Sequence, residues 1–182
     1  MLFRSVVPII RFSDKWNMKL SVFWDKYEND RGWVNSLSDE EIIFGQRTIQ
    51  TVENTLTSRY LFKNDKALSV TARHYWSKGQ YDKFFLLNYD GSLTAKAYDG
   101  EHNFNTNFFN VDVSYSWQFA PGSSLILTYK NEIYRDPYPV VPAEYGNHYD
   151  SDLKTTLNAP QTNSISLKVL YYLDYSYLKK RT

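Results

Sequence analysis

Apolar and polar side chains alternate along several segments of the chain, most sharply from Phe109 to Phe119. The odd-numbered positions of this segment are valine or aromatic, and the even-numbered positions are Asn, Asp, Ser or Gln. Because successive side chains of a β-strand point to opposite faces of a sheet, the segment predicts a strand with one apolar and one polar face.

The same alternation recurs six more times, with less regularity in some segments. These segments lie near residues 4–12, 18–25, 48–62, 68–76, 125–130 and 165–174. Pro8 falls inside the first of them, and proline cannot donate to a strand ladder, so we expect an edge strand or a bulge there. The pattern therefore predicts an all-β chain of about seven antiparallel strands.

The connections between these strands alternate in length. Short ones cover residues 13–17, 63–66 and 120–123 and contain turn-forming pairs such as Pro121-Gly122. Long ones cover residues 26–47, 77–108 and 134–163. Short periplasmic turns that alternate with long extracellular loops are typical of transmembrane β-barrels of the bacterial outer membrane, so we expect that fold and that location.

Three segments within the long stretches carry their own signals. Residues 80–93 predict an extra hairpin with Asp90-Gly91 at its tip. Residues 134–145 hold three prolines, which exclude a regular strand or helix. Residues 150–157 predict one or two helical turns.

A barrel built from this chain alone would have an odd number of strands, whereas single-chain bacterial barrels have an even number. Open strand edges are costly in lipid because unpaired backbone groups find no partner there. We therefore expect residues 1–182 to be a single segment of a larger barrel. Its partners would be outer-membrane lipid and further strands, from upstream sequence or from another chain.

Composition agrees with this interpretation without proving it. Aromatic residues make up 18% of the 182 positions, and the mean hydropathy is −0.54. Barrel strands face lipid only at alternate positions, so a polar average is compatible with them. The net charge of +1 gives no sign of a nucleic-acid partner, and the chain has no cysteine. The first residues lack the pattern of an export signal, so we expect further sequence upstream.

The polar face of the strands carries charges of both signs, which predicts a hydrated interior lined by ion pairs rather than a pore selective for one sign. The candidate interior charges are Asp112, Lys130, Glu53, Arg59, Arg73, Lys168 and Asp174. Counting outward from the Pro121-Gly122 turn places Asp112 and Lys130 close to level on neighbouring strands, where a direct or a diagonal pair is available. We therefore expect them to share the interior face within reach of each other, directly or through one water.

Aromatic side chains cluster toward the strand ends, as in the aromatic girdles of barrels. Those assigned to the long-loop ends are Trp24, Trp76, Phe109 and Tyr129, and those assigned to the short-turn ends include Trp117 and Phe119.

The sequence offers little for catalysis. It has no G-x-S-x-G motif and no cysteine nucleophile. His102 beside Glu101 and His148 near Asp150 are the only plausible bases, and no histidine has the spacing of a zinc motif. The Asn- and Asp-rich segments 88–92 and 147–152 lack the distal glutamate of a calcium loop, which favours ordinary turns. We therefore expect no enzyme activity, no metal and no cofactor.

Several short segments resemble a known family. They are Thr-Val-Glu-Asn-Thr-Leu at 51–56, Arg-His-Tyr-Trp at 73–76, Tyr-Ser-Trp-Gln-Phe-Ala-Pro-Gly-Ser at 115–123, Ala-Pro-Gln at 159–161 and Ser-Ile-Ser-Leu-Lys-Val-Leu-Tyr at 164–171. Together they are similar to the C-terminal barrel region of an uncharacterised Bacteroidota family, the domain of unknown function fifty-nine-sixteen. Its members usually carry a family-nine-type carbohydrate-binding module before the barrel. The resemblance implies an outer-membrane barrel with a cell-surface glycan as a candidate partner, and it supplies no catalytic residues.

Three functions remain open at this point. The first is a non-catalytic outer-membrane barrel component, structural or transport-associated, that anchors glycan handling at the cell surface. The second is a secreted, soluble β-sandwich module that binds carbohydrate, and the third is an outer-membrane enzyme with catalytic residues in its loops. A sandwich would bury the apolar side chains between two sheets, whereas a barrel would expose them to lipid; the side chains that decide are Val111, Val113, Leu125, Leu127, Leu167 and Val169.

Overall fold

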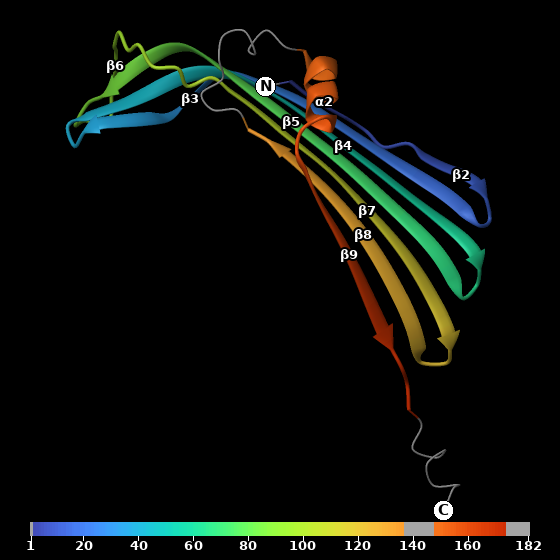
Figure 1. Ribbon diagram of the computed structural model, residues 1–182. Coiled ribbons are helices and arrows are strands. Elements are labelled where there is room, and N and C mark those ends of the chain that lie inside the picture. The colour runs from blue at the N-terminus through green and yellow to red at the C-terminus, as the bar shows by residue number, and fades with distance from the viewer. Residues whose placement is uncertain (1, 137–147, 174–182) are drawn as a thin grey trace, which may run out of the picture.

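A computed structural model describes residues 2–136 and 148–173, which form one antiparallel sheet and one short helix (Figure 1). The hydrogen-bonded order is β1-β3-β4-β5-β7-β8-β9, with β2 also paired to β3 and β6 to β5. The elements are β1 (Leu2–Val6), β2 (Ile9–Ser13), β3 (Trp16–Ser38), β4 (Glu41–Lys63), β5 (Lys66–Leu87), β6 (Leu93–Ala95), β7 (Phe104–Ala120), β8 (Ser123–Arg135), α2 (Tyr149–Leu157) and β9 (Gln161–Leu170). The all-β, antiparallel class expected from the alternation is confirmed.

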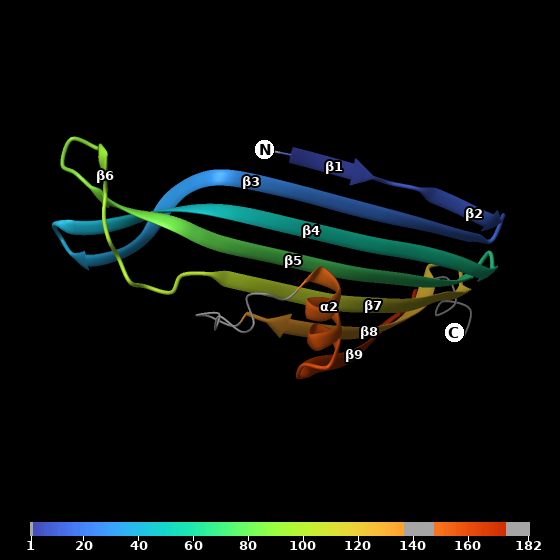
Figure 2. The ribbon, with the colours of Figure 1, turned by 90° about the horizontal axis from the view of Figure 1, so that it is seen from above.

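The sheet is open. Among the described residues, β1 and β2 pair only with β3, and β9 pairs only with β8, so these strands form the two edges. Figure 2 shows β1 and β9 at opposite sides of the sheet. The break between β1 and β2 contains Pro8, which lacks the N–H that a continuous ladder needs, so the predicted edge position of this proline is confirmed.

The three short connections are confirmed and lie at one end of the sheet (Figure 1). Two-residue turns join β2 to β3, β4 to β5 and β7 to β8. In the last of them Gly122 has a φ of 72°, a left-handed conformation that glycine adopts without steric cost. Pro121 before it presets the turn.

At the other end the structure corrects the sequence expectation. Residues 26–38, 41–47 and 77–87 continue β3, β4 and β5 as a long arm instead of forming irregular loops. The arm is held by cross-strand contacts, because the Arg47 guanidinium donates to Asp30 over 2.7 Å and to the Tyr81 hydroxyl over 2.6 Å. The predicted hairpin in residues 80–93 is confirmed: β6 folds back on β5, and Gly91 in the turn has a φ of 81°.

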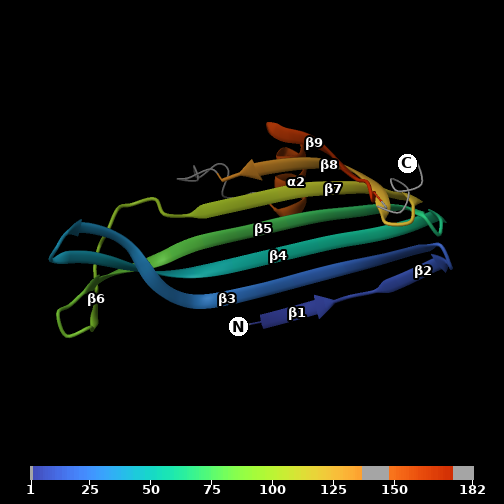
Figure 3. The same ribbon diagram turned by 90° about the horizontal axis from the view of Figure 1, so that it is seen from below.

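Helix α2 confirms the helical turns expected in residues 150–157. Figure 2 draws α2 in front of β7 and β8, and Figure 3, from the opposite side, draws it behind them. The helix therefore covers one face of the sheet, which we call the band face; the other is the polar face. Most of the proline-rich stretch 134–145 lies outside the described residues.

Little of the described structure is buried between layers. The apolar side chains with less than a tenth of their surface exposed are Ile43, Ala67, Trp76 and Ile133. In the described ranges, no helix combines the length and the apolar character that crossing a membrane would require.

Candidate functional site: the band face and the pocket beneath α2

The band face carries a continuous apolar band. In four successive rows of paired residues, no described strand contributes Asp, Glu, Lys or Arg. The uppermost row is Val6, Val22, Asn54, His74, Phe109, Ile133 and Gln161. The lowest row is Trp16, Tyr60, Leu68, Tyr115, Leu127 and Leu167.

No second sheet covers this band in the part of the chain that the structure describes. Leu127, Leu167 and Val169 expose 43%, 62% and 55% of their surface, and Val111, Val113 and Leu125 are half-buried. The burial between two sheets that a sandwich module requires is therefore not seen. A large uncovered apolar surface of this kind marks contact with another protein or with a membrane.

The height of the aromatic-bounded zone can be counted along β5. Lys66 pairs with Trp117 near the short turns, and Trp76 lies ten residues further along the strand. Ten steps of about 3.3 Å give about 33 Å along the strand, and a tilt of about 40° reduces this to about 25 Å. That height matches the apolar zone of a transmembrane β-barrel.

The polar face carries the charges singled out in the sequence. Asp112 and Lys130 are direct cross-strand partners, so the predicted register and shared face are confirmed. The ion pair formed by Asp112 is with Arg73 on the other neighbouring strand, with an Nη1–Oδ2 distance of 2.9 Å. Arg73 reaches it diagonally, because its own direct partner is Asn110.

Removing this pair is expected to cost little. Arg73 exposes 48% of its side chain and Asp112 28%, so water screens their attraction. We predict that Asp112→Asn lowers the free energy of unfolding, measured by urea titration, by less than about 1 kcal/mol. A loss of several kcal/mol would mean that the polar face is dry rather than hydrated.

The other predicted interior charges of the described residues lie on the polar face, but none of them is the direct cross-strand partner of another. Glu53 pairs with Phe23 and Tyr75, Arg59 with Asn17 and Ser69, and Lys168 with Ile126. Asp174 lies outside the described residues.

The predicted girdle residues fall on the expected levels with one exception. Trp24 and Trp76 both pair with Val52, so the two indoles lie in one row, directly above the apolar band. Phe109 lies one row lower, in the uppermost row of the band. Trp117 and Phe119 stack edge to face near the short turns. The placement of Tyr129 toward the long-loop end is wrong, because it pairs with Val113 in the middle of the band. Tyr129 is only six residues from the start of β8, which begins at the turn itself.

Helix α2 is fastened to the band face by polar contacts that sequence reasoning missed. Asp152 is fully buried, and its Oδ2 accepts hydrogen bonds from Trp76 Nε1 over 2.8 Å and from Asn105 Nδ2 over 3.0 Å. The Tyr149 hydroxyl accepts from Asn54 Nδ2 over 2.6 Å and lies 3.0 Å from His74 Nδ1. The available signal was in β7, where asparagines at 105 and 107 replace the apolar residues of the face above Phe109.

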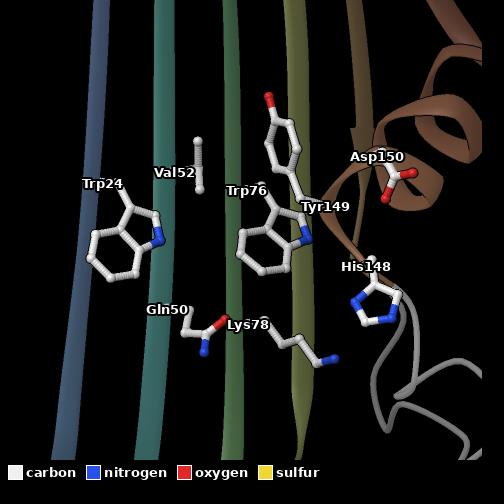
Figure 4. A pocket seen from close by; sticks show the side chains of 8 residues that line it. All are labelled: Trp24, Gln50, Val52, Trp76, Lys78, His148, Tyr149 and Asp150. Carbon is white, nitrogen blue, oxygen red and sulfur yellow. The ribbon is translucent and has the colours of Figure 1, made fainter. Parts of the chain in front are cut away.

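A pocket of about 450 Å³ lies beside this contact, between α2 and the strands β3, β4 and β5 (Figure 4). It is lined by Trp24, Gln50, Val52, Trp76, Lys78, His148, Tyr149 and Asp150. Burial raises the pKa of the Tyr149 hydroxyl, so this group stays neutral at ordinary pH. The pocket combines aromatic rings with an amide, a cation and a carboxylate, and it holds no nucleophile next to a base.

The two loop histidines proposed as bases lie in different surroundings, His102 beside Tyr98 and His148 at the pocket before α2. His102 Nε2 lies 2.9 Å from the Tyr98 hydroxyl, and the two rings stack at 5.4 Å. Burial lowers the pKa of His102, although the charge of Glu101 opposes the shift. The backbone N–H of His148 donates to Ser151 Oγ at the start of α2.

The described residues of the two Asn- and Asp-rich segments, 88–92 and 148–152, form a turn and the start of a helix. Asp90 Oδ1 accepts from the backbone N–H and the hydroxyl of Ser92 within the β5–β6 turn. Residues 148–152 form the beginning of α2. Within 2–136 and 148–173, no three His, Cys, Asp or Glu side chains are grouped as metal ligands would be.

Comparison with known proteins gives one match. The family model described as Domain of unknown function (DUF5916) matches residues 2–182. No curated protein and no solved structure matches the chain.

Proposed function

The chain belongs to the DUF5916 family, and we propose that it forms part of the wall of a transmembrane β-barrel in a bacterial outer membrane, without catalytic activity. The observation that carries the proposal is the charge-free band, open below its contact with α2, on one face of a sheet whose other face is polar. In a barrel wall the band faces lipid and the polar face lines a hydrated interior. The expected girdle levels of Trp24, Trp76, Trp117 and Phe119 support this orientation.

The two open edges support a role within a larger barrel. Within the part of the chain that the structure describes, β1 and β9 each leave one row of backbone groups unpaired, which lipid does not tolerate. Further strands of the same protein or of a partner chain would close the wall. The mixed charges of the polar face, such as Arg73 paired with Asp112, favour a structural or transport-associated role over a pore selective for one sign. The long arm of β3, β4 and β5 would then project from the cell, where it could support glycan handling.

Neighbouring positions on β5 test the orientation of the sheet. The chain has no cysteine, so a nitroxide spin label can be attached at a single introduced thiol. In membranes that contain the full-length protein, we expect a label at Val70→Cys to be relaxed mainly by oxygen, which concentrates in lipid. A label at Thr71→Cys, one residue along and on the opposite face, should be relaxed mainly by a water-soluble nickel complex.

The two labels form each other's control, because they differ by one step along the same strand. Equal access of the nickel complex to both positions would contradict the barrel and would place both faces in water. Protection of both positions from both reagents would indicate a second layer packed on the band, as in a sandwich.

A further inference from the structure

The first charged side chains above the apolar band are basic: Arg4 and Arg135 lie at the two ends of a row that contains two indoles, and Lys26 and Lys78 lie one row higher. Trp24, Val52 and Trp76 are neighbours in one row. The next row upward is Lys26, Gln50 and Lys78, on the same face of the same three strands. An amide flanked by two lysines therefore lies directly above a valine flanked by two tryptophans.

All residues of these two rows except Lys26 line the floor of the pocket, and His148 with the start of α2 forms its wall. In Figure 4 the ammonium end of Lys78 is directed toward the side of the pocket where His148 lies. The Asp152 carboxylate attracts the Lys78 ammonium group electrostatically, and Lys26 forms an ion pair with Glu28, so both cations already have an acidic neighbour. Asp150 on the wall is exposed and adds an acceptor opposite the lysine row.

The aromatic rings of the pocket favour one class of ligand over another. Trp76 offers no open ring face on which a sugar could stack, because it is only 4% exposed and Tyr149 packs against it edge to face at 5.8 Å, and Trp24 is itself half-buried. The rim of the pocket instead presents the Gln50 amide and the Lys78 ammonium group. A lysine and an amide above indoles match a phosphate, while Asp150 can accept a hydrogen bond from a hydroxyl or ammonium group of the same ligand.

We propose that this pocket binds the phosphate-bearing headgroup of a membrane lipid, whose acyl chains lie along the apolar band below. The inference rests on the proposed function, because only a membrane around the band places the Lys26–Gln50–Lys78 row at headgroup level. Indoles prefer that level, and basic side chains next to it attract anionic lipids. Helix α2 gives the site a wall, which distinguishes it from an ordinary girdle position.

Lipid binding by the full-length protein tests the site. The protein would be reconstituted into phosphatidylcholine vesicles containing a minor fraction of phosphatidic acid, and bound lipid would be counted by native mass spectrometry after release into detergent. We expect Lys78→Gln to weaken phosphatidic acid binding about fivefold. Lys78→Arg should retain binding. Lys83→Gln is the matched control, because it removes the same charge from the arm of the same strand, and it should bind as the wild type does.

The outcomes separate the site from the fold. One outcome is that the wild-type protein resists extraction from the vesicles and Lys78→Gln binds phosphatidic acid as well as the wild type does. That result would overturn the headgroup site and leave the barrel proposal standing. Wild-type protein that does not enter the vesicles would overturn both. Displacement of phosphatidic acid by an equal concentration of glycerol phosphate would also overturn the inference, because the site would then recognise a free phosphate and not a lipid.

Discussion

Replacing Val113 by lysine is expected to lower the free energy of unfolding of the membrane-inserted protein by about 2–4 kcal/mol. Val113 lies in the middle of the apolar band, paired with Val70 on one side and Tyr129 on the other. A lysine there must either lose its hydration in lipid or bend the chain toward a distant interface. The effect should be measured by urea unfolding in lipid vesicles, with tryptophan fluorescence as the signal.

Ser114→Lys is the matched control for this prediction. Ser114 is the next residue of β7, lies on the polar face and pairs with Ser69 and Thr128. A lysine at this position stays hydrated and has Asp112 two residues away on the same face, so we expect a change below about 1 kcal/mol. Equal losses in the two variants, or a larger loss for Ser114→Lys, would reverse the assignment of lipid and interior to the two faces.

The strands within the apolar band were predictable from the sequence because a membrane or a core selects alternate positions. The segment 109–119 shows this most clearly, since every second residue is valine or aromatic. The shared face of Asp112 and Lys130 was also predictable, because both follow the polar side of the alternation. The turn alone did not fix their pairing, because the register shifts between Trp117 and Ala120, and this shift places Lys130 directly opposite Asp112. The diagonal contact of Asp112 with Arg73 was not predictable, since it depends on a rotamer choice across a second strand pair.

The arm of β3, β4 and β5 was not predictable by the same argument. No residue of 26–38 is buried, and the buried positions of 41–47 are Ile43, Gly45 and Gln46, which do not form an apolar face, so burial imposes no regular alternation on the arm. The regular pairing is also interrupted between Tyr27 and Asp30, where Asn29 has a φ of 60°. What holds the arm together is long-range: Arg31 donates to Gln46, and Arg47 binds Asp30 and Tyr81. Such contacts join residues that only the folded hairpin brings together.

The attachment of α2 to the sheet was not predictable from sequence patterns either. The helix was expected from its composition, but Asp152 contacts Trp76, which is 76 positions earlier in the chain. Acidic residues near a helix start ordinarily interact with its exposed N–H groups, and Asp150 fits that use. Nothing local separates Asp152 from Asp150, although one is fully buried and the other is exposed.

That difference predicts the second large effect. Asp152→Ala would leave Trp76 Nε1 and Asn105 Nδ2 without an acceptor in a buried site. Each unsatisfied buried donor costs about 1–3 kcal/mol, while removal of the carboxylate relieves part of its own desolvation cost. We expect a net loss of about 2–3 kcal/mol in the attachment of α2 to the sheet. The amides of the helix should then exchange with deuterium at least about 30-fold faster, because opening of the helix becomes that much more frequent.

Asp150→Ala separates this contact from a general effect on the helix. Asp150 stands in the same first turn and is exposed, so its removal should cost less than about 1 kcal/mol through the helix dipole alone. The exchange of strand amides in β7 and β8 should not change in either variant if α2 detaches locally from a wall that remains intact. Equal exchange rates in the two variants would show that the buried contacts of Asp152 do not hold the helix. In that case the hydrogen bonds of Tyr149 to Asn54 and His74 would have to fix α2 over the band face.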